Sequence, residues 1–129
     1  MKRRRRCSIV LAGLALLLTG LVGACVSQQP TEYTNPNQGI EIGIGEQFII
    51  ALESNPTTGY EWEVDFDESL LELARSDFTP AKTGLTGAGG EQRFTFEGLK
   101  AGKTDVTLTY KRQWEQDFAD QKVFIVSIK

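Results

Sequence analysis

Few residues of this chain could support covalent or acid–base chemistry. The sequence has no histidine, and its two cysteines, Cys7 and Cys25, both lie near its start. The absence of histidine, together with the absence of cysteine after position 25, excludes the common nucleophile–base pairs and most zinc sites. The segment from Asp65 to Glu68 is rich in carboxylates, but it lacks the spacing and the glycine of a calcium loop, so we expect a solvated acidic turn. The sequence therefore predicts neither an enzyme nor a bound metal or cofactor.

The residues suited to binding another protein fall into three segments, and the first reads as a stiff loop. It consists of Asn55, Pro56, Thr57, Thr58, Gly59 and Tyr60. The proline ring presets φ and the glycine tolerates a left-handed backbone, while β-branched Thr57 and Thr58 have restricted rotamers. A stiff loop loses little conformational entropy when it binds. The alternative is an ordinary hairpin turn, and we expect Tyr60 to lie half in the core.

The second and third segments are weaker signals when each is taken alone. They are Gly87, Ala88, Gly89 and Gly90, followed by Arg112, Gln113 and Trp114. Glycines allow close main-chain approach, although a glycine cluster is more often a connector, and this one lacks the residues of a phosphate-binding loop. Tryptophan beside arginine is typical of an interface hot spot. The alternative is a core tryptophan beside a solvated arginine.

Together, the three segments resemble the signature of the chagasin family of cysteine-peptidase inhibitors. That signature has an Asn-Pro-Thr-Thr-Gly-aromatic loop, a Gly-x-Gly-Gly loop and an Arg-Pro-Trp loop. The resemblance extends over roughly Gly39 to Lys129 and implies reversible, competitive occlusion of papain-like cysteine peptidases. It also implies that Thr57 lies nearest the catalytic cysteine and that the glycine loop follows one flank of the cleft. Gln113 departs from the pattern, because proline is usual there.

Apolar residues alternate with period two in the runs between these segments, which predicts β-strands. Examples are Ile40-Ile42-Ile44, Phe48-Ile50-Leu52, Tyr60-Trp62-Val64 and Val106-Leu108-Tyr110. We expect an all-β fold, an immunoglobulin-like β-sandwich of seven to eight antiparallel strands. Alternate loops of such a sandwich gather at one end, so three segments spaced about 30 and 24 residues apart are predicted to form one edge.

The first 24 residues are typical of a lipoprotein signal peptide. A basic stretch, Lys2–Arg6, precedes the apolar stretch Ile9–Leu18, and Val22-Gly23-Ala24-Cys25 resembles a lipobox. We expect residues 1–24 to be removed and Cys25 to carry a lipid. The alternative is an uncleaved helix from Ser8 to Val26 that spans the membrane, which its glycines disfavour.

Residues 25–38 are expected to form the lipidated cysteine and a flexible tether, because they are rich in Gln, Pro, Thr and Asn. The inhibitor domain would then occupy residues 39–129. It has no cysteine, so it must fold without a disulfide. Once Lys2–Arg6 are removed, nine basic residues face 17 acidic ones, a net charge of −8. This balance argues against nucleic acid and leaves the lipid as the membrane attachment.

These observations predict an exported, monomeric inhibitor, anchored to the cell membrane or envelope through Cys25 with its domain facing the periplasm or the exterior. A second interpretation comes from another functional class. The same scaffold could serve a surface lipoprotein as an adhesion or assembly module, because a fold does not determine a function.

Overall fold

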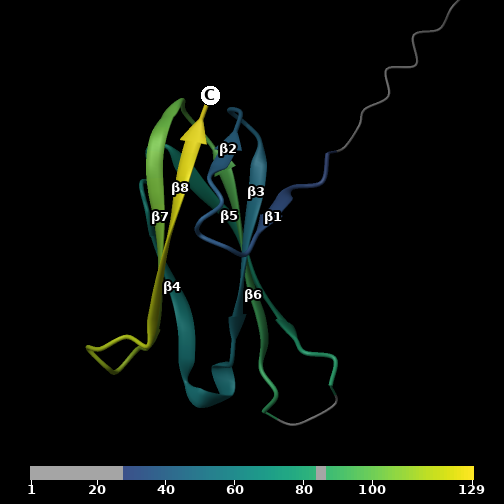
Figure 1. Ribbon diagram of the computed structural model, residues 1–129, viewed down its shortest axis with the longest axis vertical. Coiled ribbons are helices and arrows are strands. Elements are labelled where there is room, and N and C mark those ends of the chain that lie inside the picture. Colours follow the sequence, from purple (N-terminus) through teal and green to yellow (C-terminus); the bar gives the residue numbers. More distant parts are fainter. Residues whose placement is uncertain (1–27, 84–86) are drawn as a thin grey trace, which may run out of the picture.

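Two four-stranded sheets face each other across an apolar core in this computed structural model, which describes residues 28–83 and 87–129 (Figure 1). The strands are β1 (Thr31–Tyr33), β2 (Ile40–Ile42), β3 (Gln47–Ser54), β4 (Tyr60–Phe66), β5 (Leu71–Pro80), β6 (Gly90–Gly98), β7 (Gly102–Arg112) and β8 (Asp120–Ile128), with a 3₁₀ turn, η1 (Pro56–Thr58), after β3. One sheet has the order β1-β3-β6-β5 and the other β2-β8-β7-β4. The predicted immunoglobulin-like β-sandwich is confirmed.

The core is built by the alternation that the sequence displays. In β3 the side chains of Phe48, Ile50 and Leu52 are buried, and the same alternation buries apolar residues of β7 and β8. Phe48 stacks on Phe96 of β6, with 5.4 Å between ring centroids. Trp62 of β4 closes the core beneath the loops, and its indole N–H donates to the Glu53 carbonyl at 2.9 Å.

Two of the eight strands run parallel to their neighbours, which corrects the expectation of a purely antiparallel sandwich. β1 pairs parallel with β3, and β2 pairs parallel with β8. The connections explain this result, because residues 34–39 and the turn after Ile42 each carry the chain to the facing sheet. No hairpin forms there, so nothing forces an antiparallel partner.

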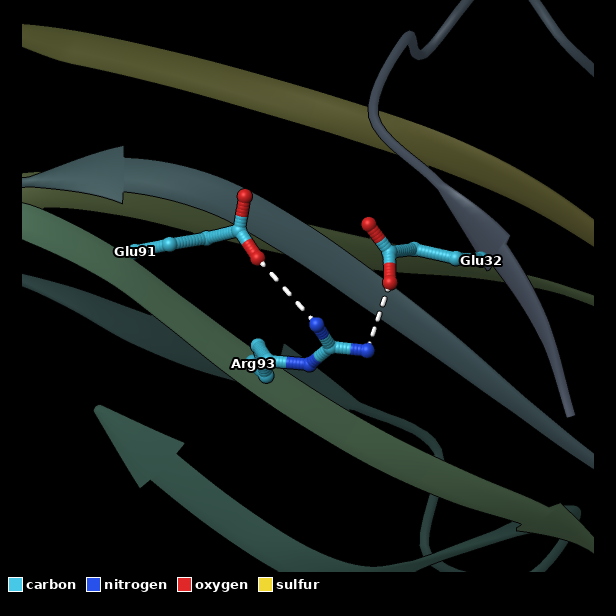
Figure 2. Close-up of polar contacts among 3 residues, drawn as sticks. All are labelled: Glu32, Glu91 and Arg93. Atoms are coloured by element: carbon cyan, nitrogen blue, oxygen red, sulfur yellow. Dashed lines mark hydrogen bonds and ion pairs between the residues drawn. The ribbon is translucent and has the colours of Figure 1, made fainter. Parts of the chain in front are cut away.

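β1 lies inside the stretch that we expected to be a flexible tether. Its Glu32 forms an ion pair with Arg93 of β6, which also contacts Glu91 at 3.4 Å (Figure 2). β3 lies between β1 and β6, so this ion pair spans it. On the inner side, the Tyr33 ring meets Phe48 edge-on at 6.3 Å. The folded domain therefore begins before Gly39.

The acidic segment is divided between a strand and a turn. Asp65 belongs to β4, whereas Asp67 begins an exposed turn into β5, at the end of the sandwich away from η1. The Ser69 hydroxyl donates to the Asp67 carboxylate at 2.6 Å, and the Ser69 N–H donates to it at 2.9 Å. Both bonds lower the pKa of Asp67, and the hydroxyl bond has the larger effect. Within residues 28–83 and 87–129, no cluster of side chains suited to a metal ion occurs.

The signal peptide expected at residues 1–24 and the lipidation expected at Cys25 fall outside the described residues. Within the described ranges, no helix has the length and apolar character needed to cross a membrane.

We expect a chain that starts at Gly39 to be less stable than one that starts at Gln28. It loses the β1–β3 pairing and the Tyr33–Phe48 contact, together worth about 2 kcal/mol. The melting temperature, followed by circular dichroism, should fall by about 10 °C.

Glu32→Gln is the matched control for the ion pair alone. Both partners are partly exposed, so the free energy of unfolding of this variant should fall by less than about 1 kcal/mol. Equal melting temperatures for the two starting points would show that β1 adds nothing to the domain.

Candidate functional site

The three segments singled out from the sequence lie in loops at one end of the sandwich, opposite to the C-terminus (Figure 1). The first connects β3 to β4, the second connects β5 to β6, and the third connects β7 to β8. The predicted gathering of the three loops at one end is confirmed. What the sequence does not reveal is how they are joined.

The β3–β4 loop is a tight turn with its own hydrogen bonds. Pro56 occupies the first turn of η1, where a missing N–H costs nothing. The Thr58 N–H donates to the Asn55 carbonyl at 3.1 Å, and the Thr58 hydroxyl donates to the same oxygen at 2.6 Å. Gly59 then takes φ +83°, a left-handed value that favours glycine, and its N–H donates to the Pro56 carbonyl at 2.9 Å. The tip carrying exposed Thr57 is therefore fixed before any partner arrives.

Asn55 joins this loop to its neighbours through both side chain and backbone. Its amide N–H₂ donates to the Gly87 carbonyl of the β5–β6 loop at 3.1 Å, and its side-chain oxygen accepts from the Thr57 hydroxyl. Its backbone N–H donates to the Tyr110 hydroxyl of β7 at 2.9 Å. One residue thus ties the first loop to the second loop and to the facing sheet.

The glycine segment packs directly against the first loop. Gly89 has φ +74°, and a Cβ there would lie 2.9 Å from the Ser54 carbonyl oxygen and 3.2 Å from Asn55 Cβ. Gly90 opens β6, opposite Ser54 of β3. These two glycines have a packing role of their own, while Gly87 and Ala88 are exposed beside the tip. The connector alternative does not account for this close approach.

Arg112 joins the third loop to the first loop, on the side of the first loop away from the glycine segment. Its Nε–H donates to the Thr58 carbonyl at 3.0 Å, and its Nη1 pairs with Glu115 at 3.1 Å. The guanidinium also lies 4.4 Å from the centroid of the Tyr60 ring, within cation–π range. The third loop is therefore bonded to the first through a half-buried arginine.

Trp114 is a surface residue and not part of the core. Its side chain is 71% exposed, whereas Trp62 is the core tryptophan at 6%. One edge of the Trp114 ring rests on Gly59, where a Cβ would lie 2.5 Å from Trp114 Cη2. Gly59 therefore has two roles, because it completes the turn and leaves room for the Trp114 ring to pack against the backbone. The alternative of a core tryptophan is wrong for Trp114.

Gln113 occupies the second position of a β-turn that closes the base of the third loop. The Glu115 N–H donates to the Arg112 carbonyl at 3.1 Å. No non-glycine residue in the described ranges has positive φ, so Gln113 and Trp114 fit a type I turn. Proline is favoured at this second position, where φ is about −60°. Gln113 therefore stands at a turn position that also suits proline.

A column of aromatic rings connects the loops to the core. Tyr60 stacks on Tyr110 at 5.2 Å, and Tyr110 packs on Trp62 at 4.9 Å. Tyr60 is half-buried, as expected. Tyr110 and Glu115 also support the site, although neither was predicted to from the sequence. The strand period assigns Tyr110 to the core, and only the position of Glu115 three residues after Arg112 hints at an ion pair.

The sequence of the folded domain is similar to that of known proteins. Residues 41–128 match the family model described as Chagasin family peptidase inhibitor I42. The chain is 34% identical over 96 residues to chagasin of Trypanosoma cruzi, a match that covers 70% of this chain and 86% of chagasin.

Two solved structures resemble the fold. The cysteine protease inhibitor EhICP2 from Entamoeba histolytica matches with a TM-score of 0.67 at 21% identity, covering 77% of this chain and 94% of that one. PbICP-C, solved in complex with falcipain-2, matches with a TM-score of 0.51 at 25% identity, covering 81% and 94%.

We expect Asn55→Ala to loosen the first two loops, since it removes the bonds to Gly87 and Thr57. The amides of Thr58 and Gly59 should exchange hydrogen faster, and the free energy of unfolding should fall by about 1 kcal/mol. Hydrogen exchange read residue by residue gives the answer. Asn35→Ala removes a similar local bond from an exposed turn elsewhere and should leave both amides unchanged. Unaltered exchange in the Asn55 variant would contradict the role given to this side chain.

Proposed function

This chain belongs to the chagasin family of peptidase inhibitors, and from that premise we propose that its three loops together occlude the active-site cleft of a papain-like cysteine peptidase. It is a protein inhibitor of cysteine peptidases and not an enzyme.

One observation carries the proposal: Asn55 and Arg112 bond the three loops into a single edge before binding. A preassembled edge enters a cleft with little loss of conformational entropy. Thr57 stands exposed at its tip, where it would cover the catalytic cysteine, with the glycine loop on one side and Trp114 on the other. No covalent bond is made or broken, so the inhibition is reversible. It is competitive because the loops occupy the cleft that the substrate needs.

The same rigidity explains how the inhibitor avoids becoming a substrate. A peptidase cleaves a segment that can extend across its catalytic centre, whereas η1 is held in a closed turn by the bonds of Thr58 and Gly59. Extending this turn would break those bonds and the contacts of Asn55. The loop therefore blocks the centre in a shape unsuited to cleavage.

We also propose that Cys25 carries a lipid and holds a monomeric domain at the cell membrane or envelope, facing the periplasm or the exterior. The support is the Val-Gly-Ala-Cys order after a basic and then apolar stretch. The direction of β1 fits this proposal. Thr31 pairs with Phe48 near the start of β3, whereas the first loop follows the last residue of β3. The anchor would therefore attach at the end away from the three loops.

Trp114→Ala should weaken inhibition of papain by about 2 kcal/mol or more, as expected for a buried aromatic anchor. The melting temperature should change little, because the ring is largely exposed in the free protein. Inserting one residue within Pro56–Thr58 should harm inhibition at least as much, since it destroys the turn. A tryptophan variant that inhibits like wild type would contradict the role given to Trp114 and the three-loop mechanism.

Gln113→Pro should keep or improve inhibition. A type I turn has φ of about −60° at this position, a value that proline adopts, and Arg112 before it is in a strand, as a residue preceding proline prefers. Stabilisation of about 0.4–1 kcal/mol is expected from the stiffer unfolded chain. Inhibition constants and melting curves of the two proteins give the comparison. A loss of both affinity and stability would contradict the turn assigned here.

Cys25→Ser should abolish lipid attachment and release the protein from membranes or leave it unprocessed. Mass spectrometry of the membrane fraction provides the measurement. An intact Met1–Ala24 segment with an unmodified Cys25 on wild-type protein would contradict the proposed anchor.

A further inference from the structure

A second exposed aromatic residue lies in the β7–β8 loop, outside the three segments. Phe118 is 54% exposed. The other exposed large apolar residues of the described ranges, apart from Trp114, are in turns at the opposite end or in strands: Ile44, Phe78, Leu99, Val123 and Ile125. In the described part of the three loops, Trp114 and Phe118 are thus the two large apolar side chains offered to solvent. An exposed aromatic pair on one loop is typical of a contact surface.

Both stems of this loop are fixed. At one stem the turn from Arg112 to Glu115 is closed by a backbone hydrogen bond and an ion pair. At the other stem the Ala119 N–H donates to the Tyr110 carbonyl at 2.8 Å, directly after Phe118. Phe118 is therefore attached to ordered backbone, and burying its ring on binding costs little backbone entropy.

The sheet order places Phe118 beyond Trp114 along the binding edge. Trp114 follows β7 and leans on Gly59, toward the β3–β4 loop. Phe118 precedes β8, which lies on the far side of β7 from β4. In Figure 1 this loop projects outward from the base of β7 and β8. The edge formed by the three segments therefore continues past Trp114 to Phe118.

The charges around Phe118 leave one carboxylate without a partner. Glu115 is paired with Arg112, and Asp120 is paired with Lys122 at 3.3 Å. In the part of the chain that the structure describes, exposed Asp117 has no ion pair. An aromatic ring beside one free negative charge complements an apolar surface bordered by a basic side chain.

We propose that Phe118 is a second aromatic anchor that contacts the papain-like peptidase beyond Trp114, with Asp117 at its rim attracting a basic side chain of the enzyme. The proposal rests on the function proposed above. It extends the contact surface to residues that none of the three sequence segments contains.

The test measures inhibition of papain by full-length protein purified in detergent. Phe118→Ala should raise the inhibition constant about tenfold, mainly through faster dissociation, because about half of the surface of Phe118 is exposed and available for burial. Phe118→Leu should raise the inhibition constant by a smaller factor, since it keeps an apolar side chain. Ile125→Ala removes a comparably exposed apolar residue from β8 and should leave inhibition unchanged. Melting temperatures should be alike throughout.

Asp117→Asn tests the rim charge separately. It should slow association about twofold at low salt, and the difference should vanish at high salt. Equal association rates at low salt would overturn the rim contact.

The possible failures can be distinguished. If wild-type protein does not inhibit papain, the proposed function fails. If wild type inhibits and Phe118→Ala inhibits equally well, or loses inhibition only as its melting temperature falls, the second anchor is overturned.

Discussion

Hydrogen bonds from Asn55 and Arg112 fix the end of the sandwich that carries the three loops, because they join loops that lie far apart in the chain. Asn55 reaches the Gly87 carbonyl on one flank, and Arg112 reaches the Thr58 carbonyl from the other. Both acceptors are backbone oxygens, so the bonds fix the course of the main chain. The entropy of ordering the loops is therefore lost on folding, and the binding step retains more of its contact energy.

The sandwich beneath supports this arrangement in two ways. The antiparallel β4–β7 pair sets Tyr60 opposite Arg112, which brings the guanidinium onto the Tyr60 ring. The rings of Tyr60, Tyr110 and Trp62 then continue into the core. The turn from Arg112 to Glu115, which contains Gln113, is closed by its own hydrogen bond and ion pair.

Much of the fold and part of the site follow from local sequence patterns. Alternation in runs such as Phe48-Ile50-Leu52 predicts buried strand faces, and Asn55-Pro56 with Gly59 predicts a tight turn. Contacts between distant residues leave no such pattern. No local pattern around Glu32 predicts its ion pair with Arg93, which lies far away in the sequence. The polar stretch that contains β1 therefore looks like a tether in the sequence. Tyr110 follows the strand alternation, which predicts a core position. Its hydroxyl accepts a hydrogen bond from the Asn55 N–H, and this contact can be seen only in the folded structure.

The central claim is that a preassembled edge blocks a peptidase cleft without being cleaved. The most direct measurement is the steady-state inhibition of papain at several substrate concentrations, with the mass of the inhibitor recorded after prolonged incubation. Competitive occlusion predicts an apparent inhibition constant that rises linearly with substrate concentration and an inhibitor of unchanged mass. Inhibition that does not depend on substrate, or an inhibitor cut within Asn55–Tyr60, would contradict the account.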